Sequence, residues 1–109
     1  MELFTDKLSI MLFNNIFGRS NQLRNFLDEG AVIIDVRSPL EYASGHIKGS
    51  KNIPMDTLKN RVDEIKGFHK PIITVCQSGM RSGTAQAFLT EKGLRVMNGG
   101  PWTSLNKIA

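Results

Sequence analysis

Short apolar runs alternate with helix-type patterns from Ser20 to the end of this chain. Two of the runs, at residues 31–36 and 71–75, are continuous, which is typical of strands buried on both faces. Strands that alternate with helices favour a parallel sheet covered on both sides. We therefore predict an α/β fold with a central parallel sheet of about four to five strands and helices on both faces. A chain of 109 residues has room for one such core.

Capping residues, glycines and prolines predict where the helices of the chain begin and end. Ser38, Pro39 and Glu41 form a capping box that opens a short helix, because the serine and the glutamate satisfy each other's backbone donors. Glycines and a proline then predict a loop over residues 45–54. The other expected elements are a helix from Ser20 or Asn21 to Gly30, a helix from Asp56 to Gly67, a helix over 82–92, a short strand over 94–97 and a helix over 102–107.

Cys76 is the one cysteine of the chain, and it stands between the apolar run at 71–75 and the helix-type pattern that follows. Small residues and Arg81 come directly after it. Backbone N–H groups of such a turn, together with the positive end of the next helix, favour a nucleophilic thiolate. A free cysteine often serves as a small buried hydrophobe, but the flanking residues favour the nucleophile here. A single cysteine excludes C-x-x-C redox chemistry and a cysteine-rich zinc site.

The chain carries a formal net charge of +4, from 14 Lys and Arg against 10 Asp and Glu. Its basic residues are scattered singly, and aromatic residues make up only 7% of the chain, which argues against nucleic-acid binding. The positive balance suits a small anionic substrate better. A free reactive thiol is most at home in a reducing compartment, so we expect a cytoplasmic location.

Residues 1–18 are expected to form an apolar, amphipathic extension ahead of a domain at 19–109. The apolar segment at 8–13 is too short to cross a bilayer, which needs about 20 apolar residues. It also lacks the basic n-region and the cleavage site of a signal peptide. We expect its apolar face to dock on the domain or on another subunit, and contact with a membrane surface is the alternative left open.

Five groups of residues stand in an order and spacing that resemble those of the rhodanese (thiosulfate sulfurtransferase-like) family. They are Asp35-Val36-Arg37 with Glu41-Tyr42, Gly45-His46-Ile47, Gly49-Ser50 with Asn52-Ile53-Pro54, the loop from Cys76 to Ser82, and Gly99-Gly100 with Trp102. The resemblance extends over roughly residues 20–107 and implies a rhodanese-like fold for the domain.

A protein that resembles this family would use Cys76 in a persulfide cycle. The resemblance implies that its thiolate takes a sulfane sulfur from thiosulfate or a persulfide and passes it to a thiol or to cyanide, without a metal or cofactor. A partner protein could serve as donor or acceptor. Two other functions stay open, a sulfur-carrier module loaded by a partner enzyme and a phosphatase-like enzyme of the same fold. The loop from Cys76 through Arg81 is one residue shorter than in related cell-cycle phosphatases, which favours sulfur transfer.

The resemblance and the chemistry of the side chains together assign roles within this loop. Cys76 is the expected nucleophile, and Arg81 is the expected partner of the oxyanion end of the donor, since a guanidinium offers forked donors. Met80 is expected to line the mouth of the pocket and to help choose the substrate. The residues expected to contribute mainly backbone N–H groups are Gln77, Ser78, Gly79, Met80 and Ser82.

Asp35 and Arg37 end the strand expected next to that of Cys76, and they are assigned a supporting role. Carboxyl ends of parallel strands gather at the ligand-binding edge of a sheet. Asp35 is therefore expected to hold the Cys76 loop by hydrogen bonds, with Arg37 or Arg81 as a partner.

Four further residues are assigned no catalytic role. Glu41 is explained by the capping box, and His46 by a structural hydrogen bond within the loop at 45–54. His69 is expected at the surface, and Trp102 is expected to pack over the sheet edge. Attack on a sulfane sulfur moves no proton, so a general base is not required.

Overall fold

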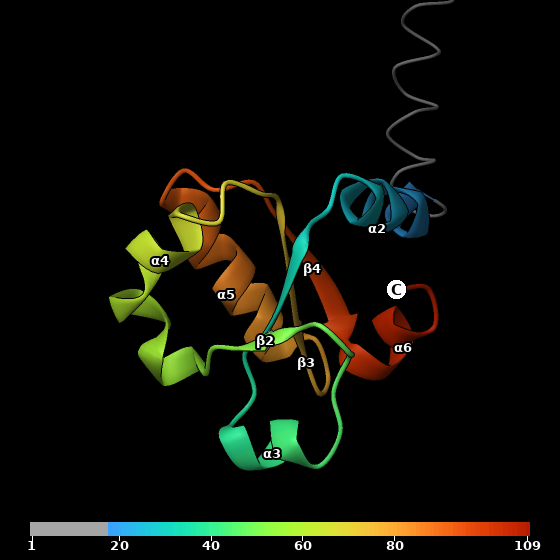
Figure 1. Ribbon diagram of the computed structural model, residues 1–109, viewed down its shortest axis with the longest axis horizontal. Helices are drawn as coiled ribbons and strands as arrows, with labels where there is room; N and C mark the ends of the chain where they lie inside the picture. Colours follow the sequence, from blue (N-terminus) through green and yellow to red (C-terminus); the bar gives the residue numbers. More distant parts are fainter. Residues whose placement is uncertain (1–17) are drawn as a thin grey trace, which may run out of the picture.

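The computed structural model describes residues 18–109, which form a four-stranded parallel sheet covered by helices on both faces (Figure 1). The strands are β1 (Val32–Asp35), β2 (Lys51–Asn52), β3 (Ile72–Cys76) and β4 (Val96–Pro101), in the spatial order β2-β1-β3-β4. The helices are α2 (Gly18–Asp28), α3 (Pro39–Ala43), η1 (Met55–Asn60), α4 (Val62–Lys66), α5 (Met80–Glu91) and α6 (Trp102–Asn106), with η1 a 3-10 helix. The predicted fold class is confirmed.

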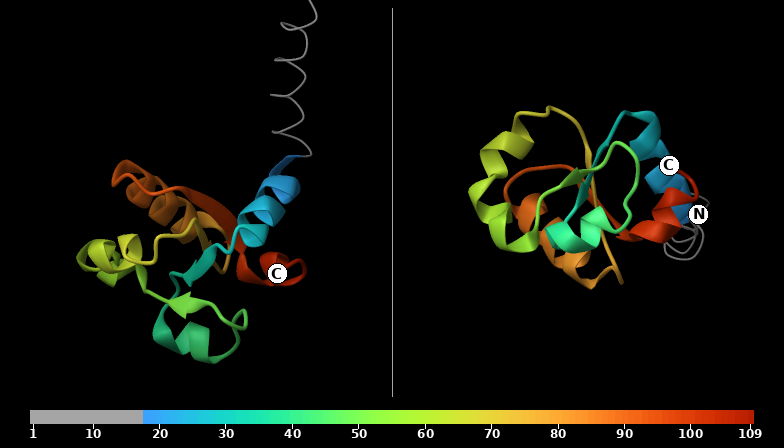
Figure 2. Two further views of the ribbon diagram at one scale, coloured as in Figure 1. Left: turned by 45° about the horizontal axis from the view of Figure 1, so that its top comes forward. Right: turned by 60° about the horizontal axis from the view of Figure 1, so that its bottom comes forward.

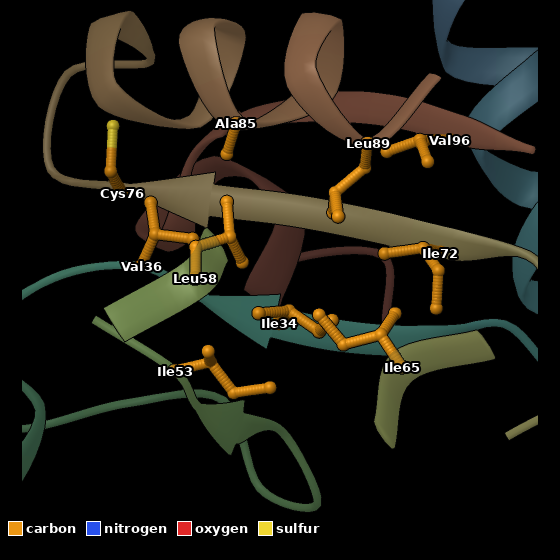
Figure 3. Packing of buried hydrophobic residues seen from close by; sticks show 10 residues of the cluster. All are labelled: Ile34, Val36, Ile53, Leu58, Ile65, Ile72, Cys76, Ala85, Leu89 and Val96. Carbon is orange, nitrogen blue, oxygen red and sulfur yellow. The ribbon is translucent and has the colours of Figure 1, made fainter. Parts of the chain in front are cut away.

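The helices divide between the two faces of the sheet (Figures 1 and 2). Helices η1, α4 and α5 cover one face, where Leu58, Ile65 and Leu89 pack with alternate residues of the strands (Figure 3). Helices α2 and α6 cover the other face, where Leu23 and Leu105 pack with the remaining strand residues. Strands with apolar side chains on both faces have to lie inside such a sandwich, because either exposed face would leave apolar surface in water.

Strand β3 lies between β1 and β4, and all five of its residues are buried. Its pairing with β4 shifts register between Thr74 and Val75, so Cys76 stands opposite Pro101. The shift is possible because the facing strand carries Gly99, where a Cβ atom would lie 2.7 Å from Cγ2 of Ile73. Strand β3 is therefore a fully buried inner strand that places Cys76 at the carboxyl edge of the sheet.

The structure corrects the predicted boundaries of several elements. Ser20 and Asn21 lie inside α2 and do not cap it, since exposed polar residues are tolerated within a helix. The helix predicted from Asp56 is broken at Arg61, whose φ of −122° is not helical, and Asp56 lies in the first turn of η1. Helix α5 begins at Met80, two residues earlier than predicted.

Two strands also differ from their predicted positions. Strand β4 runs from Val96 to Pro101, beyond the predicted strand over 94–97, because Gly99 packs closely against Ile73 and Val75 of β3. Strand β2 lies within the predicted loop at 45–54 and pairs with β1 over only two residues. Short edge strands carry too few residues to show a strand pattern in the sequence.

The predicted extension at residues 1–18 lies almost wholly outside the described residues. Its boundary with the domain and its docking face therefore stay predictions. Between residues 18 and 109, no helix is both long enough and apolar enough to span a membrane.

Leu89 and Leu40 provide a matched test of this core. Leu89 of α5 is fully buried, whereas Leu40 of α3 is 82% exposed. We expect Leu89→Ala to lower the free energy of unfolding by about 2–5 kcal/mol, because it removes buried methyl groups and leaves a cavity. Leu40→Ala should change it by less than about 0.5 kcal/mol. Urea unfolding measures both values, and equal effects of the two substitutions would contradict the packing described.

Candidate active site

Cys76 is the last residue of β3, and three residues separate it from the first turn of α5. The chain turns at Gly79, the residue before α5, which has a φ of +98°. Glycine reaches this left-handed conformation without strain. A Cβ atom at Gly79 would also lie 3.3 Å from Cα of Gly100 in β4. A glycine is therefore required where the loop turns its N–H groups inward.

Three hydrogen-bonding groups converge on the sulfur of Cys76, which points toward the start of α5 (Figure 3). The backbone N–H groups of Gly79 and Ser82 donate to Sγ at 3.0 and 3.3 Å. The hydroxyl oxygen of Ser82 also lies 3.3 Å from Sγ. Cys76 is fully buried, so these groups stand in place of water around the sulfur. The predicted roles of Gly79 and Ser82 as backbone donors agree with this geometry.

The surroundings of Cys76 act on its pKa in opposite directions. Burial raises the pKa of the thiol, since it removes water from the charged form. Hydrogen bonds from the Ser82 hydroxyl and from the backbone N–H groups of Ser82, Gly79 and Ser78 lower it. The hydrogen bonds outweigh burial, and the pKa of Cys76 lies below its ordinary value. The site therefore favours a thiolate.

Asn98 of β4 holds the Cys76 loop in place through hydrogen bonds of its side-chain amide. This residue was not identified from the sequence. Its amide nitrogen donates to the carbonyl of Gly79 at 3.0 Å, and its amide oxygen accepts from the backbone N–H of Gly100 at 2.9 Å. These two contacts fix the orientation of the amide. The same oxygen accepts from the hydroxyl of Ser82 at 2.7 Å. The single hydroxyl proton of Ser82 thus has two acceptors within reach, Asn98 Oδ1 and Cys76 Sγ.

Arg81 forms a two-bond ion pair with Glu41 of α3. Its Nη1 and Nη2 atoms lie 2.8 and 3.0 Å from the two carboxylate oxygens. The predicted capping box is present as well, since Glu41 also accepts from the backbone N–H of Ser38. Arg81 belongs to the Cys76 loop, but its guanidinium contacts α3. The sequence interpretation of Glu41 as a cap alone was therefore incomplete.

Asp35 and Arg37 form a buried ion pair beside the loop. Nε and Nη2 of Arg37 lie 2.9 and 2.7 Å from the two oxygens of Asp35. Nη2 also donates to the carbonyl of Gly45 at 2.7 Å, and the guanidinium stacks on Trp102 at 4.9 Å. The carboxylate of Asp35 thus accepts from Arg37, one of its two expected partners, but these hydrogen bonds lie at its own strand end and not in the Cys76 loop, where we expected them. The pair holds α3 and the Gly45 turn against the sheet.

The remaining residues singled out in the sequence lie around this centre. Gln77, Ser78 and Met80 are exposed, and Met80 is 78% exposed. His46 is exposed; its Nδ1 lies 2.7 Å from the carbonyl of Tyr42, and its ring stacks on that of Tyr42. Its partner therefore lies in α3 and not in the loop at 45–54. Within residues 18–109, no three His, Cys, Asp or Glu side chains are grouped so that they could hold a metal ion.

A family model for the rhodanese-like domain matches residues 20–101. The chain belongs to the rhodanese-like family. The match includes the whole Cys76 loop and ends at the last residue of β4. The parallel sheet and the flanking helices are therefore those of a rhodanese-like domain.

Individual relatives agree with this family. The uncharacterized protein YqhL of Bacillus subtilis (strain 168) is 46% identical over 63 residues, which cover 58% of this chain and 49% of that protein. The thiosulfate sulfurtransferase GlpE of Pseudoalteromonas translucida (strain TAC 125) is 40% identical over 66% of this chain and 70% of its own length. A solved structure of rhodanese with anions from E. coli has a TM-score of 0.62 and 32% identity, over 68% of this chain and 89% of that one. The chain thus spans about half of YqhL.

Ser82→Ala tests the hydrogen bonds at the sulfur. We expect the pKa of Cys76 to rise, because the thiolate loses one donor. Loss of a hydrogen bond to a charged group corresponds to about a tenfold fall in the thiolate fraction. Alkylation by iodoacetamide as a function of pH measures this fraction, since reactivity is lost as the pH falls through the pKa of the thiol. Ser78→Ala is the matched control, because its hydroxyl does not contact the sulfur. Identical pH profiles for wild type and Ser82→Ala would contradict this account.

Proposed function

We propose that this protein is a sulfurtransferase that moves a sulfane sulfur from thiosulfate or a persulfide to a thiol or to cyanide through a persulfide on Cys76. The observation that carries the proposal is the convergence of the N–H groups of Gly79 and Ser82 on the Cys76 sulfur. Membership of the rhodanese-like family supports it, as does the name thiosulfate sulfurtransferase of the GlpE relatives.

The proposed reaction has two half-reactions. In the first, the Cys76 thiolate attacks the outer sulfur of thiosulfate, a new S–S bond forms, and the old one breaks to release sulfite. In the second, a thiolate or cyanide attacks the outer sulfur of the persulfide and restores the Cys76 thiolate. Both forms of the residue carry negative charge on sulfur. The same loop donors can therefore stabilise the anion before and after the transfer.

The size of the loop favours sulfur transfer over phosphate-ester hydrolysis. Cys76 and Arg81 enclose four residues, and donors at 3.0 and 3.3 Å already surround a single sulfur atom. A tetrahedral phosphate group bound to the sulfur would need a wider ring of N–H donors. We infer that phosphate esters are not substrates.

A sulfur carrier loaded by a partner protein is the second candidate. The observation in its favour is Met80, which lies in the catalytic loop and is 78% exposed. Exposed apolar side chains beside a reactive group suit contact with another protein. A partner would then serve as sulfur donor or acceptor at Cys76. A cytoplasmic location is part of the proposal, since a reducing compartment keeps the thiol free.

Cys76→Ser tests the proposal directly. We expect wild-type protein to form thiocyanate from thiosulfate and cyanide, and Cys76→Ser to reduce the rate to that of the uncatalysed reaction while the protein stays folded. Ser78→Ala should retain turnover, because its side chain lies outside the set of sulfur contacts. A colorimetric thiocyanate assay and circular dichroism provide the two readouts.

Retained turnover in Cys76→Ser would exclude the persulfide mechanism. A wild-type protein that forms no thiocyanate, but accepts sulfur from a cysteine desulfurase, would identify the carrier function instead. Hydrolysis of a phosphate ester by the wild type, lost in Cys76→Ser, would exclude the loop-size argument.

A further inference from the structure

The guanidinium of Arg81 is already occupied by a carboxylate. Each of its terminal nitrogens faces one oxygen of Glu41, at 2.8 and 3.0 Å. This parallel two-bond arrangement is also the one by which a guanidinium binds sulfate or phosphate. Glu41 therefore occupies the two guanidinium nitrogens that an anionic sulfur donor would bind.

Glu41 is fixed in this position by its own helix. Its Oε1 accepts from the backbone N–H of Ser38 at 3.0 Å, and its backbone N–H donates to the hydroxyl of Ser38 at 3.2 Å. Its carbonyl accepts from Nη1 of the buried Arg37 at 3.3 Å. The hydrogen bonds from Arg81 and then from Ser38 lower the pKa of Glu41 to about 2, so its carboxylate is charged at neutral pH.

A second acidic residue lies in the lining of a cavity that Arg81 also lines. Arg81 lines a cavity of about 260 Å³ together with Asp56, and Cys76 is not part of that lining. In the part of the chain that the structure describes, Arg81 is the one basic residue that lines this cavity. Arg81 thus pairs with one acidic side chain, Glu41, and shares the lining of this cavity with a second, Asp56. The positive net charge of the chain is therefore not concentrated in this cavity.

We propose that Glu41 competes with anionic donors for Arg81 and so directs the protein toward persulfides of thiols and away from thiosulfate. This inference rests on the proposed sulfurtransferase function and specifies its donor. Thiosulfate carries a dianionic leaving group, sulfite, which has to displace the Glu41 carboxylate before Arg81 can bind it. The leaving group of a persulfide, R–S–SH, is a thiolate, which has no oxyanion for a guanidinium to bind.

The favoured half-reaction balances without a further reactant. The Cys76 thiolate attacks the outer sulfur of R–S–SH, and a bond forms between the two sulfurs. The S–S bond of the donor breaks, and its electron pair leaves with R–S⁻. The outer sulfur keeps its proton in this step, so the products are Cys76–S–SH and R–S⁻, and transfer of that proton to R–S⁻ or to water then leaves the Cys76 persulfide anion. No electrons are gained or lost overall.

Glu41→Gln is the variant that tests the competition. The glutamine amide oxygen can still accept from Ser38, so the capping box is preserved while the negative charge is lost. We expect the KM for thiosulfate to fall roughly two- to fivefold, the range that corresponds to an exposed ion pair. The kcat/KM for the persulfide of 2-mercaptoethanol, which carries no oxyanion, should change less than twofold.

Sulfate binding separates this inference from the proposed function, because it requires no turnover. In the Cys76→Ser background, calorimetric titration with sulfate should show two- to fivefold tighter binding when Glu41→Gln is added, in line with the value of an exposed ion pair. Arg81→Ala should abolish sulfate binding in both proteins. Unchanged or weaker sulfate binding in the Glu41→Gln protein would overturn the inference, even if sulfur transfer itself is established.

The chain contains a matched control for the loss of charge. Arg61 and Glu64 form the same kind of two-bond pair, with both distances 2.9 Å and similar exposure, away from the Cys76 loop. Glu64→Gln should leave the KM for thiosulfate and sulfate binding unchanged. An equal effect of Glu64→Gln and Glu41→Gln would assign the change to net charge and overturn the role of Glu41.

Discussion

The hydrogen bonds that converge on the Cys76 sulfur depend on most of the domain. Gly79 supplies one of them only because its left-handed conformation turns the loop back over the end of β3. A hydrogen bond from the side-chain amide of Asn98 in β4 to the Gly79 carbonyl stabilises that conformation. The central position of β3 buries the sulfur, so that backbone N–H groups replace water as its donors. A lowered thiol pKa inside a buried site is the result of this arrangement, because burial alone would have raised it.

Helix α3 connects the buried Asp35–Arg37 pair to Arg81 of the Cys76 loop. Its capping box is a local feature that would stabilise any short helix, but the glutamate of that box also binds Arg81 across 40 residues of sequence. Arg37 holds the same helix through the Glu41 carbonyl and pairs with Asp35 at the end of β1. A change in α3 would therefore act on Arg81, the proposed donor-binding residue, without a direct contact to Cys76. Under the proposed function, selection among donors through Arg81 would be separate from stabilisation of the thiolate by Gly79 and Ser82.

Much of the fold and the position of Cys76 could be predicted from the sequence, because the residues that define them are close together in the chain. The apolar run before Cys76 defined β3, and Ser38 with Glu41 defined the start of α3. The Glu41–Arg81 pair and the contact of Asn98 with the loop could not be predicted, since neither partner carries a pattern that points to the other. Strand β4 extends beyond the predicted strand over 94–97 for a related reason. Gly99 reads as a turn residue, but it is required by close packing against Ile73.

Intact-protein mass spectrometry after incubation with thiosulfate or a thiol persulfide tests the central claim most directly. Cys76 is the only cysteine, so a persulfide on the protein can form at one residue alone. The account predicts a gain of one sulfur atom, absent in Cys76→Ser and removed by cyanide as thiocyanate. A protein that gains no sulfur from either donor, or that gains it equally in Cys76→Ser, would contradict the claim that Cys76 carries the transferred sulfur.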